Sequence, residues 1–340
     1  MLRRFPVGKL PPEVLRKLLA RCPVPRDSGV VIGPRFGEDA AVIDVGSKYL
    51  VAKTDPITFT AERIGWYAVN INANDIATLG ARPRWFLATL LLPEKGPTES
   101  LAQSIFNDIL RACRTLAVTL VGGHTEITSG IARPIVVGHM LGEVEKTKLI
   151  RKESQRPGDV VLLTKGVAVE GTAILAREKR AFLERKLGKA LVRRAQRLLF
   201  RPGISVIRDA RLALRHGEVR AMHDPTEGGL LSGLYELAHA GGIGLRIWKD
   251  RIPVLAETQA LATALKFDPL GLIASGALLA VVSRRSAAAI LRALHRNRIR
   301  AALIGEVRRS TEGMQIVESD GESSPLRVPA RDEIARLLGS

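Results

Sequence analysis

The sequence contains little of what disulfide frameworks and soft-metal sites require. Among its 340 residues only two are cysteines, Cys22 and Cys113, and six are histidines. The two cysteines have no spacing typical of zinc ligands and cannot form a disulfide framework. We therefore expect a cytoplasmic enzyme without structural zinc or a disulfide scaffold.

Long hydrophobic runs and low-complexity segments are also missing. No apolar stretch approaches the roughly 20 residues needed to cross a bilayer, so we expect no membrane partner. Hydrophobic residues still make up 46% of the chain, which is typical of a folded globular protein. A chain of this length has room for two domains, each with its own core.

Aromatic residues are scarce, and this bears on the strong positive charge. The net charge is +18, and the densest basic run extends over residues 177–215. Leucines at 183, 187, 191 and 198 form an apolar side of this run, so we interpret its charges as a solvated helix face. Because single-strand binding relies on aromatic stacking, this pattern argues against a nucleic-acid partner. An arginine-rich surface also fits a thermophilic protein.

The stretch that organises the chain is WYAVNINANDIATLGARP, residues 66–83. Trp66, Val69, Ala73 and Ile76 fall at helical spacing and predict a buried helix face. The same helix carries Asn74 and Asp75 beside two further asparagines, each costing roughly half a kcal/mol relative to alanine. A buried carboxylate is costly unless it is paired or bound to a metal. The pattern predicts a helix, Ile64–Leu79, that holds a ligand.

Two further aspartates lie upstream of this helix beside strand-like runs. Asp39 stands at the head of an apolar run, and Asp55 follows Thr54 at the end of another. If Asp39, Asp55 and Asp75 converge, their oxygen ligands suit Mg²⁺ and phosphate better than zinc. Each residue alone also has a purely structural interpretation. Asp39 could cap a turn, Asp55 could precede a tight bend, and Asp75 could be a surface residue.

Two glycine- or acid-containing turns follow later in the chain. Gly122 and Gly123 end a strand over 116–121, and they either allow close approach to a ligand or form a plain turn. Asp224 and Thr226 stand where we expect a helix to begin, and a helix N-terminus suits a phosphate. The alternative is that Asp224 only caps this helix.

Strands and helices alternate along both halves of the chain, which predicts a two-domain α+β fold. The polar segment 143–159 divides the chain, so we expect domains at 1–145 and 156–340. The remaining expected elements, in order, are a helix at 12–21; strands at 29–43, 49–54, 85–92, 134–141 and 160–164; helices from 98, at 170–180 and before 241; and strands at 270–282 and 301–307 around a helix at 287–296.

In order, these motifs resemble the PurM-like, AIR synthase-related ATP-binding proteins, which include aminoimidazole ribonucleotide synthetase, selenophosphate synthetase, thiamine-monophosphate kinase and the hydrogenase-maturation protein HypE. The resemblance covers nearly the whole chain and is strongest to HypE and its archaeal relatives. The motifs are Gly37-Glu38-Asp39-Ala40-Ala41-Val42, Thr54-Asp55, Asn74-Asp75-Ile76-Ala77, Gly80-Ala81-Arg82-Pro83, Gly122-Gly123-His124-Thr125-Glu126, Arg156-Pro157-Gly158-Asp159 and His223-Asp224-Pro225-Thr226-Glu227-Gly228-Gly229.

The resemblance implies a homodimer whose N-terminal-domain strands form a barrel, with ATP and Mg²⁺ as cofactors. It implies that Asp39, Asp55 and Asp75 coordinate magnesium and phosphates with Asn74 beside them. The Gly122-Gly123 turn would approach the nucleotide, and Asp224 would come from the second domain. We add Lys53, because a cation next to Thr54 and Asp55 can reach a phosphate.

Three departures from the HypE pattern shape the functional expectation. HypE ends in a cysteine that is carbamoylated and then dehydrated, whereas this sequence ends Leu337-Leu338-Gly339-Ser340. The glycine-rich N-terminal segment is reduced to Gly8. His124 replaces an acidic residue after the glycine pair, so either Glu126 substitutes as a metal ligand or His124 contacts substrate, unless His124 is merely structural.

We therefore expect a Mg-ATP-dependent, HypE-like enzyme in which an oxygen or amide group attacks a nucleotide phosphate, with no such reaction on a cysteine tail of its own. A maturation protein is a possible partner. The alternatives are a small-molecule kinase or synthetase, such as one acting on thiamine monophosphate or an aminoimidazole precursor, and a non-catalytic nucleotide-binding scaffold.

Overall fold

The computed structural model describes residues 5, 7–96 and 98–339, which form two compact units. The smaller unit comprises Val24–Gly33 and Asp39–Leu149, and the larger unit comprises Met1–Pro23, Pro34–Glu38 and Ile150–Ser340. The smaller unit holds 12 basic and 12 acidic residues, so the excess of +18 lies entirely in the larger unit. The domain limits expected from the sequence, 1–145 and 156–340, stay a prediction.

The smaller unit is built on a six-stranded sheet in the order β1-β2-β3-β6-β4-β5. Neighbouring strands pair antiparallel except β4 and β5, which are parallel. Strand β5 forms one edge of the sheet. The strands are β1 (Val30–Ile32), β2 (Ala41–Asp44), β3 (Lys48–Ile57), β4 (Arg82–Pro93), β5 (Thr119–Thr128) and β6 (Ile135–Glu145).

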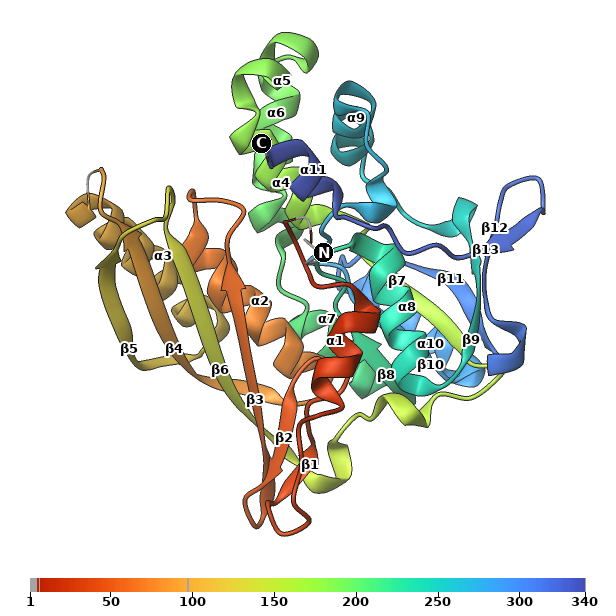
Figure 1. Ribbon diagram of the computed structural model, residues 1–340. Helices are drawn as coiled ribbons and strands as arrows, with labels where there is room; N and C mark the ends of the chain where they lie inside the picture. The colour runs from red at the N-terminus through yellow and green to blue at the C-terminus, as the bar shows by residue number, and fades with distance from the viewer. Residues whose placement is uncertain (1–4, 6, 97, 340) are drawn as a thin grey trace, which may run out of the picture. The chain divides into compact units, whose positions relative to one another are not determined.

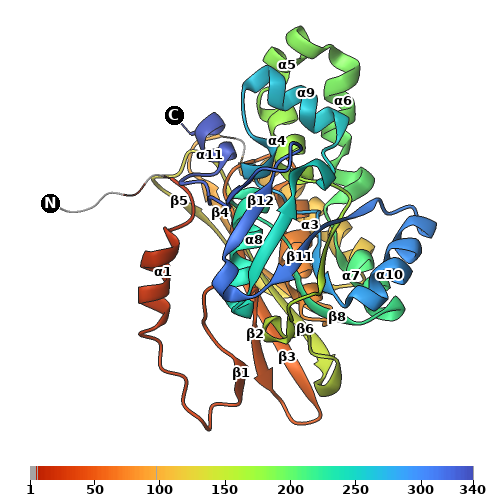
Figure 2. The same ribbon diagram turned by 90° about the vertical axis from the view of Figure 1, so that its right-hand side faces the viewer.

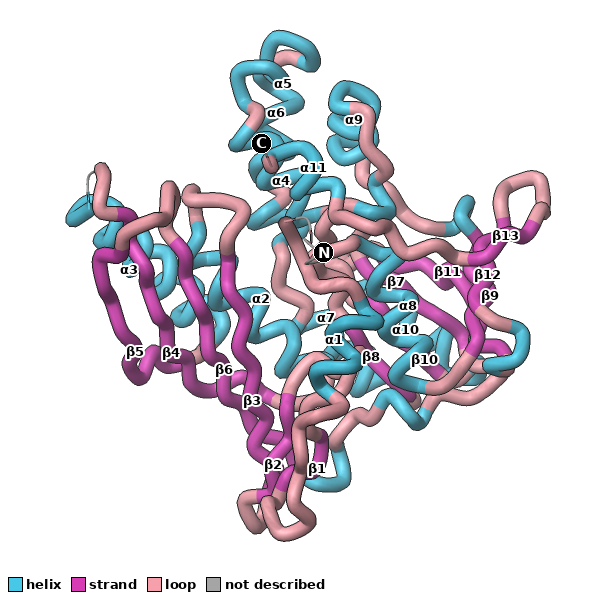
Figure 3. The backbone as a smooth tube through the Cα atoms, viewed as in Figure 1, coloured by secondary structure: helices cyan, strands magenta, loops and turns pink. Residues whose placement is uncertain are grey.

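Helices α2 (Ile64–Thr78) and α3 (Thr98–Leu116) pack on this sheet and on each other. Figures 1 and 3 show both helices on the same face of the sheet. Residues in β4 and β6 alternate between buried and half-exposed, as expected when only one sheet face is covered. The opposite face of the sheet therefore presents half-exposed side chains.

Helix α2 is buried along its entire length, which goes further than the one buried face that the sequence spacing predicts. Every one of its residues from Ile64 to Thr78 is buried, the asparagines and Asp75 included. The helix is mostly apolar or small all round, which is typical of a helix enclosed on several sides. Gly65 allows close packing, because a Cβ atom there would lie 2.5 Å from the Ile105 carbonyl oxygen of α3.

The larger unit contains a seven-stranded sheet in the order β13-β12-β9-β11-β7-β10-β8. Figure 2 shows β12, β9 and β11 side by side in this sheet. Strand β7 is buried throughout and lies inside the sheet between β11 and β10. The strands are β7 (Val160–Thr164), β8 (Val219–His223), β9 (Gly244–Trp248), β10 (Leu279–Val282), β11 (Ala301–Arg308), β12 (Met314–Val317) and β13 (Ser323–Pro325).

Helices surround the larger sheet. Helices α7 and α10 pack against each other and against strands β8 and β11, respectively. The basic run extends from the end of α4 through α5 and α6 into α7. Of the four leucines expected on its apolar side, Leu183 and Leu198 are buried, and Leu187 and Leu191 are half-buried. The helices are α1 (Pro12–Leu19), α4 (Val169–Glu178), α5 (Arg180–Leu187), α6 (Lys189–Arg197), α7 (Ile207–His216), α8 (Gly229–Gly241), α9 (Ala256–Leu265), α10 (Arg284–Arg296) and α11 (Glu333–Leu338).

The fold confirms the α+β prediction but corrects two strands. The run 29–43 contains two short strands, β1 and β2, because the chain turns between them at Gly33–Ala40. The strand expected over 270–282 is confined to β10, since Pro269–Gly271 forms a 3₁₀ turn and Gly276 has a φ of +107°. No helix within the described ranges is long and apolar enough to cross a membrane.

Candidate functional site

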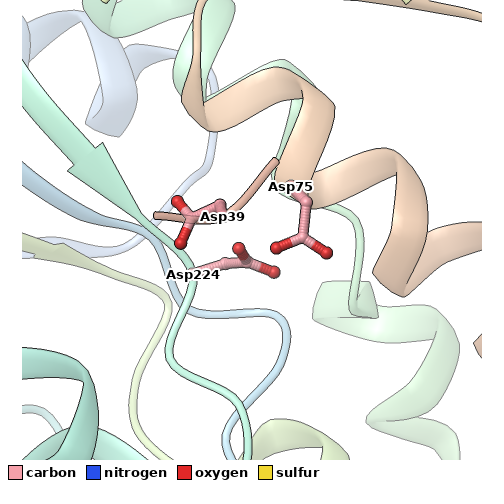
Figure 4. Close-up of side chains that lie close together, drawn as sticks. All are labelled: Asp39, Asp75 and Asp224. Carbon is pink, nitrogen blue, oxygen red and sulfur yellow. The ribbon is translucent and has the colours of Figure 1, made fainter. Parts of the chain in front are cut away.

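Two of the expected metal ligands, Asp39 and Asp75, lie close together in the smaller unit. Asp75 projects from the last turn of α2, and Asp39 lies in the loop before β2 (Figure 4). They are 5% and 3% exposed, and each offers a carboxylate oxygen within 4.8 Å of the other. Two buried like charges at this separation repel each other, so the pair is stable only with nearby positive charge or donors.

One such donor is Thr78, the last residue of α2, which the sequence interpretation did not identify. Its hydroxyl lies 2.9 Å from Asp39 Oδ2 and 2.7 Å from the Asp75 carbonyl oxygen. Thr78 is fully buried. The end of α2 therefore carries a side chain that orients Asp39 next to Asp75.

Lys53 on strand β3 supplies the positive charge. Its Nζ lies 3.2 Å from Asp55 Oδ2 and 3.5 Å from Asp75 Oδ2. Lys53 and Asp55 are two residues apart on one strand, so both face α2. The structure thus joins Asp55 to Asp75 through a shared lysine, which brings Lys53, Asp55, Asp75 and Asp39 to one side of the sheet.

The asparagines of α2 divide into two groups. Asn70 and Asn72 donate to backbone carbonyls one turn earlier, at Trp66 and Ala68, each at 2.9 Å. Asn72 also lies 3.4 Å from the Asp55 carbonyl oxygen and so links α2 to β3. Asn74 is fully buried next to Asp75 in the sequence. Asn70 and Asn72 thus have structural partners within the smaller unit.

Three expected site residues lie on the opposite face of the sheet. Thr54 alternates with Lys53 and Asp55 and is exposed. His124 and Glu126 are exposed on edge strand β5, where His124 Nε2 lies 3.3 Å from Glu126 Oε2. In the sheet order, β5 is three strand spacings, about 14 Å, from β3. Within one chain, Glu126 is therefore not positioned to share a metal with Asp75.

The structure explains why glycines occupy positions 122 and 123. Gly122 and Gly123 have φ of +158° and +154° and lie inside β5, next to a register shift against β4. A Cβ atom at Gly123 would lie 2.0 Å from the Ala88 carbonyl oxygen. The close approach at Gly123 is thus between two strands. The plain-turn alternative is wrong, because the pair lies inside β5, and contact with a ligand stays a prediction.

Asp224 and Thr226 lie in the larger unit, in the turn that follows β8. Asp224 is buried, and α8 begins only at Gly229, so Asp224 is not the residue that caps this helix. A different anion occupies the helix N-terminus: Asp332 accepts a hydrogen bond from the Gly228 amide. Burial raises the pKa of Asp332 to about 7 against the lowering effect of three backbone hydrogen bonds. Asp332 thus occupies one amide at this end of α8, and phosphate binding at Asp224 and Thr226 stays a prediction.

The two-unit α+β fold agrees with an AIR synthase-related class of protein. The model of AIR synthase related protein, N-terminal domain, matches residues 37–144, and that of the C-terminal domain matches residues 156–317. The chain belongs to this AIR synthase-related family, as the sequence motifs predicted.

Within the family, its relatives include hydrogenase-maturation proteins. A putative hydrogenase expression/formation protein of Methanocaldococcus jannaschii is 29% identical over 314 residues, which is 90% of each chain. The carbamoyl dehydratase HypE of Rhizobium leguminosarum is 30% identical over 282 residues, covering 80% of this chain and 77% of its own. These names confirm the predicted resemblance to HypE and the expectation of an enzyme.

Solved structures show the same fold. The hydrogenase maturation protein HypE in complex with ATP has a TM-score of 0.71 at 24% identity, covering 87% of this chain and 89% of its own. AaThiL complexed with AMPPCP and TMP has a TM-score of 0.67 at 20% identity, covering 91% and 92%. At these identities the likeness concerns the fold.

Proposed function

We propose that the chain is a HypE-like enzyme that binds ATP with Mg²⁺ at Asp39 and Asp75. The observation that carries this proposal is the pair of buried carboxylates within 4.8 Å of each other. The pair fits Mg²⁺, which binds through one or two carboxylates together with substrate phosphates and water. Bound Mg²⁺ would offset the charge of both aspartates and of the triphosphate.

The neighbouring groups have distinct roles in this proposal. Thr78 holds Asp39 in the orientation for metal binding through its 2.9 Å hydrogen bond. Lys53, 18% exposed at its side chain, exchanges an aspartate for a phosphate oxygen when nucleotide binds. Asn74 and Asp55 complete the smaller unit's contribution. We propose Asp224 and Thr226 as the larger unit's contribution on the basis of the family resemblance.

In the proposed reaction, an oxygen or amide group attacks a phosphorus atom of ATP. A new O–P bond forms, the phosphoanhydride bond to that phosphorus breaks, and the remaining phosphate or nucleotide leaves with the electron pair. Mg²⁺, when bound, supplies charge stabilisation at the phosphates. Lys53 contributes a fixed cation beside them, and the buried setting of Asp39 and Asp75 limits competition from water. The names of the carbamoyl dehydratase relatives favour an amide acceptor. We propose that a maturation protein presents this amide, because a solved structure of HypE contains it in complex with HypF.

Calorimetric titration with ATP, with and without Mg²⁺, tests the site. We expect magnesium-dependent ATP binding in the wild type and a dissociation constant for ATP that is at least tenfold higher in Asp75→Asn. Slow phosphate release should occur only with the wild type. Asp44→Asn is the matched control, because Asp44 is an exposed aspartate of the same unit paired with Lys146. Equal affinities in the two variants would contradict the assignment.

A substrate panel separates the acceptor classes. If the protein acts as a carbamoyl dehydratase, a peptide with a carbamoylated thiol should stimulate ATP consumption. Stimulation by thiamine monophosphate or an aminoimidazole precursor would favour the small-molecule kinase or synthetase alternative. Saturable ATP binding without turnover in every combination would favour the non-catalytic scaffold.

We further propose that the uncovered face of the six-stranded sheet forms a homodimer interface. Apolar side chains cluster there, on the face opposite α2 and α3. Register places Leu50, Trp85, Leu87, Leu91, Val137 and Leu141 on this one face. A half-exposed apolar sheet face of this kind is typical of a surface covered by a partner. Thr54, His124 and Glu126 lie on the same face, so dimerisation would bring them near a second copy.

Size-exclusion chromatography with light scattering tests the dimer. Leu87→Glu places a charge in the middle of the proposed interface, so we expect a monomer. Val45→Glu is the control, because Val45 is an exposed apolar residue of the same unit in the β2–β3 turn. A wild-type monomer at micromolar concentration would contradict the proposed interface.

A further inference from the structure

A buried lysine, Lys152, lies at the centre of a polar network within the larger unit. Its side chain is fully buried, with 1% of the residue exposed. A buried ammonium is costly unless oxygen or nitrogen acceptors replace its water. Its Nζ lies 2.5 Å from the Gly37 carbonyl oxygen and 3.3 Å from His223 Nδ1. Lys152 thus links two segments that are far apart in the sequence.

The contacts of His223 determine its tautomer. A lysine ammonium only donates hydrogen bonds, so His223 Nδ1 must be the acceptor in its contact with Lys152. The proton of the neutral ring is therefore on Nε2, which lies 3.1 Å from Glu236 Oε2 and donates to it. This arrangement fixes both the ring orientation and the direction of the hydrogen bonds.

The network continues to the N-terminal segment through Glu236. Lys9 Nζ lies 2.7 Å from Glu236 Oε1, and the Lys9 amide donates to Glu227 Oε1 at 2.7 Å. Burial alone would raise the pKa of Glu236, but the Lys9 charge and the bond with His223 lower it to about 2. Glu236 is therefore a permanent anion between two cationic or donor groups.

The two anchor points of Lys152 are adjacent to candidate site residues. Gly37 precedes Asp39 by two residues, and His223 directly precedes Asp224. Position 37 has no room for a side chain, because a Cβ atom there would lie 2.7 Å from the Glu236 carbonyl oxygen, so the backbone at Gly37 packs closely on α8. The network therefore fixes the backbone immediately before each of these aspartates.

We propose that Lys152 is a positioning residue of the nucleotide site, which holds the chain at Gly37 and His223 and thereby fixes Asp39 and Asp224 for metal-dependent ATP binding. This inference rests on the proposed function above. The sequence offered no signal for it, since Lys152 lies in a polar segment that reads as a linker.

The chain provides a matched control in Lys165. This second lysine of the larger unit is also buried, and its Nζ donates to the Ser205 and Gly276 carbonyl oxygens at 2.6 and 2.9 Å. It also pairs with Asp209 at 3.0 Å. Lys165→Met and Lys152→Met therefore both remove a buried ammonium, and both should lower the melting temperature.

The test compares the magnesium dependence of ATP binding, expressed as the ratio of dissociation constants without and with Mg²⁺. We expect Lys152→Met to reduce the wild-type ratio at least tenfold and Lys165→Met to leave it within twofold. A purely structural role would lower the melting temperature without changing this ratio. If Lys152→Met does not fold, Glu236→Gln provides the second variant, and it should reduce the ratio about threefold.

Each outcome has a distinct meaning. Equal ratios in Lys152→Met and Lys165→Met, or an unchanged ratio in Glu236→Gln when that variant has to be used, would overturn the positioning role while leaving the proposed function standing. A wild-type ratio near one would overturn the proposed function itself, and the positioning role with it.

Discussion

The Thr78 hydroxyl lies 2.9 Å from Asp39 Oδ2, which ties the end of helix α2 to the loop before strand β2. Asp75, the other buried carboxylate, stands one helical turn before Thr78. Because of Thr78, the C-terminal end of α2 both carries one candidate metal ligand, Asp75, and orients the other, Asp39. The geometry of the pair thus depends on where α2 ends.

Thr78→Val should therefore weaken the site while preserving its shape. The substitution is nearly isosteric but removes the hydroxyl and leaves Asp39 without this donor. We expect a loss of about 1–2 kcal/mol in unfolding free energy and a 5- to 10-fold weaker magnesium-dependent ATP affinity. Urea unfolding and calorimetry measure the two effects, and Thr78→Ser, which keeps the hydroxyl, is the control. Wild-type affinity in Thr78→Val would contradict this role.

Lys53→Met should have opposite effects on the metal and on the nucleotide. Lys53 Nζ lies 3.5 Å from Asp75, so it competes with a cation for that carboxylate. Its removal should tighten Mg²⁺ binding in the absence of nucleotide and weaken Mg-ATP binding about tenfold, because one charge-assisted contact to phosphate is lost. Lys48→Met, on the same strand and paired with Glu143, is the control. Effects of the same sign on both ligands would argue against a phosphate contact.

Sequence periodicity predicted the position of α2, because apolar residues at helical spacing are a strong pattern. The convergence of Asp39 and Asp75 was only one alternative from the residues themselves, and it was the family resemblance that implied a shared role. The grouping of Thr54 with Asp55 is different. Adjacent residues of a strand face opposite sides of a sheet, so Thr54 lies on the uncovered face, away from Asp75. Strand alternation alone would have revealed this.

Other features depend on tertiary contacts that no local pattern encodes. Thr78 resembles any helix-terminal threonine until the loop carrying Asp39 is placed beside it. Residues 270–278 are apolar because they are buried, yet they pair with no strand among the described residues, so composition alone predicted a strand wrongly. The contact between Lys152 and Gly37 joins positions 115 residues apart.

Glu170 should make stability fall as pH rises. Burial raises the pKa of this carboxyl group from about 4.5 to about 7, with Asp332 and Glu227 adding to the shift against the Ser275 hydrogen bonds. The folded state therefore favours the protonated acid. The associated stability is fully present below pH 4.5 and is lost as pH rises through 7.

Glu170→Gln removes this titration while retaining an oxygen that accepts from the Ser275 amide. We expect the variant to be more stable than the wild type by about 3 kcal/mol at pH 8.5, with the difference disappearing near pH 4.5. Urea unfolding at several pH values measures the difference. Glu178→Gln, at an exposed position on the same helix, is the control. A pH-independent difference would show that Glu170 does not titrate in this range.

Gly122 and Gly123 form an internally controlled pair, because their φ angles are nearly equal but their surroundings differ. An added Cβ at Gly123 would lie 2.0 Å from the Ala88 carbonyl oxygen, whereas at Gly122 the nearest atom, Leu87 Cδ2, would be 3.9 Å away. Gly122→Ala should therefore cost about 1 kcal/mol through backbone strain alone. Gly123→Ala should cost about 3 kcal/mol, because β5 must also move away from β4. Thermal unfolding measures both values, and equal costs would mean that a glycine at 123 is required for its backbone conformation and not for the approach of the two strands.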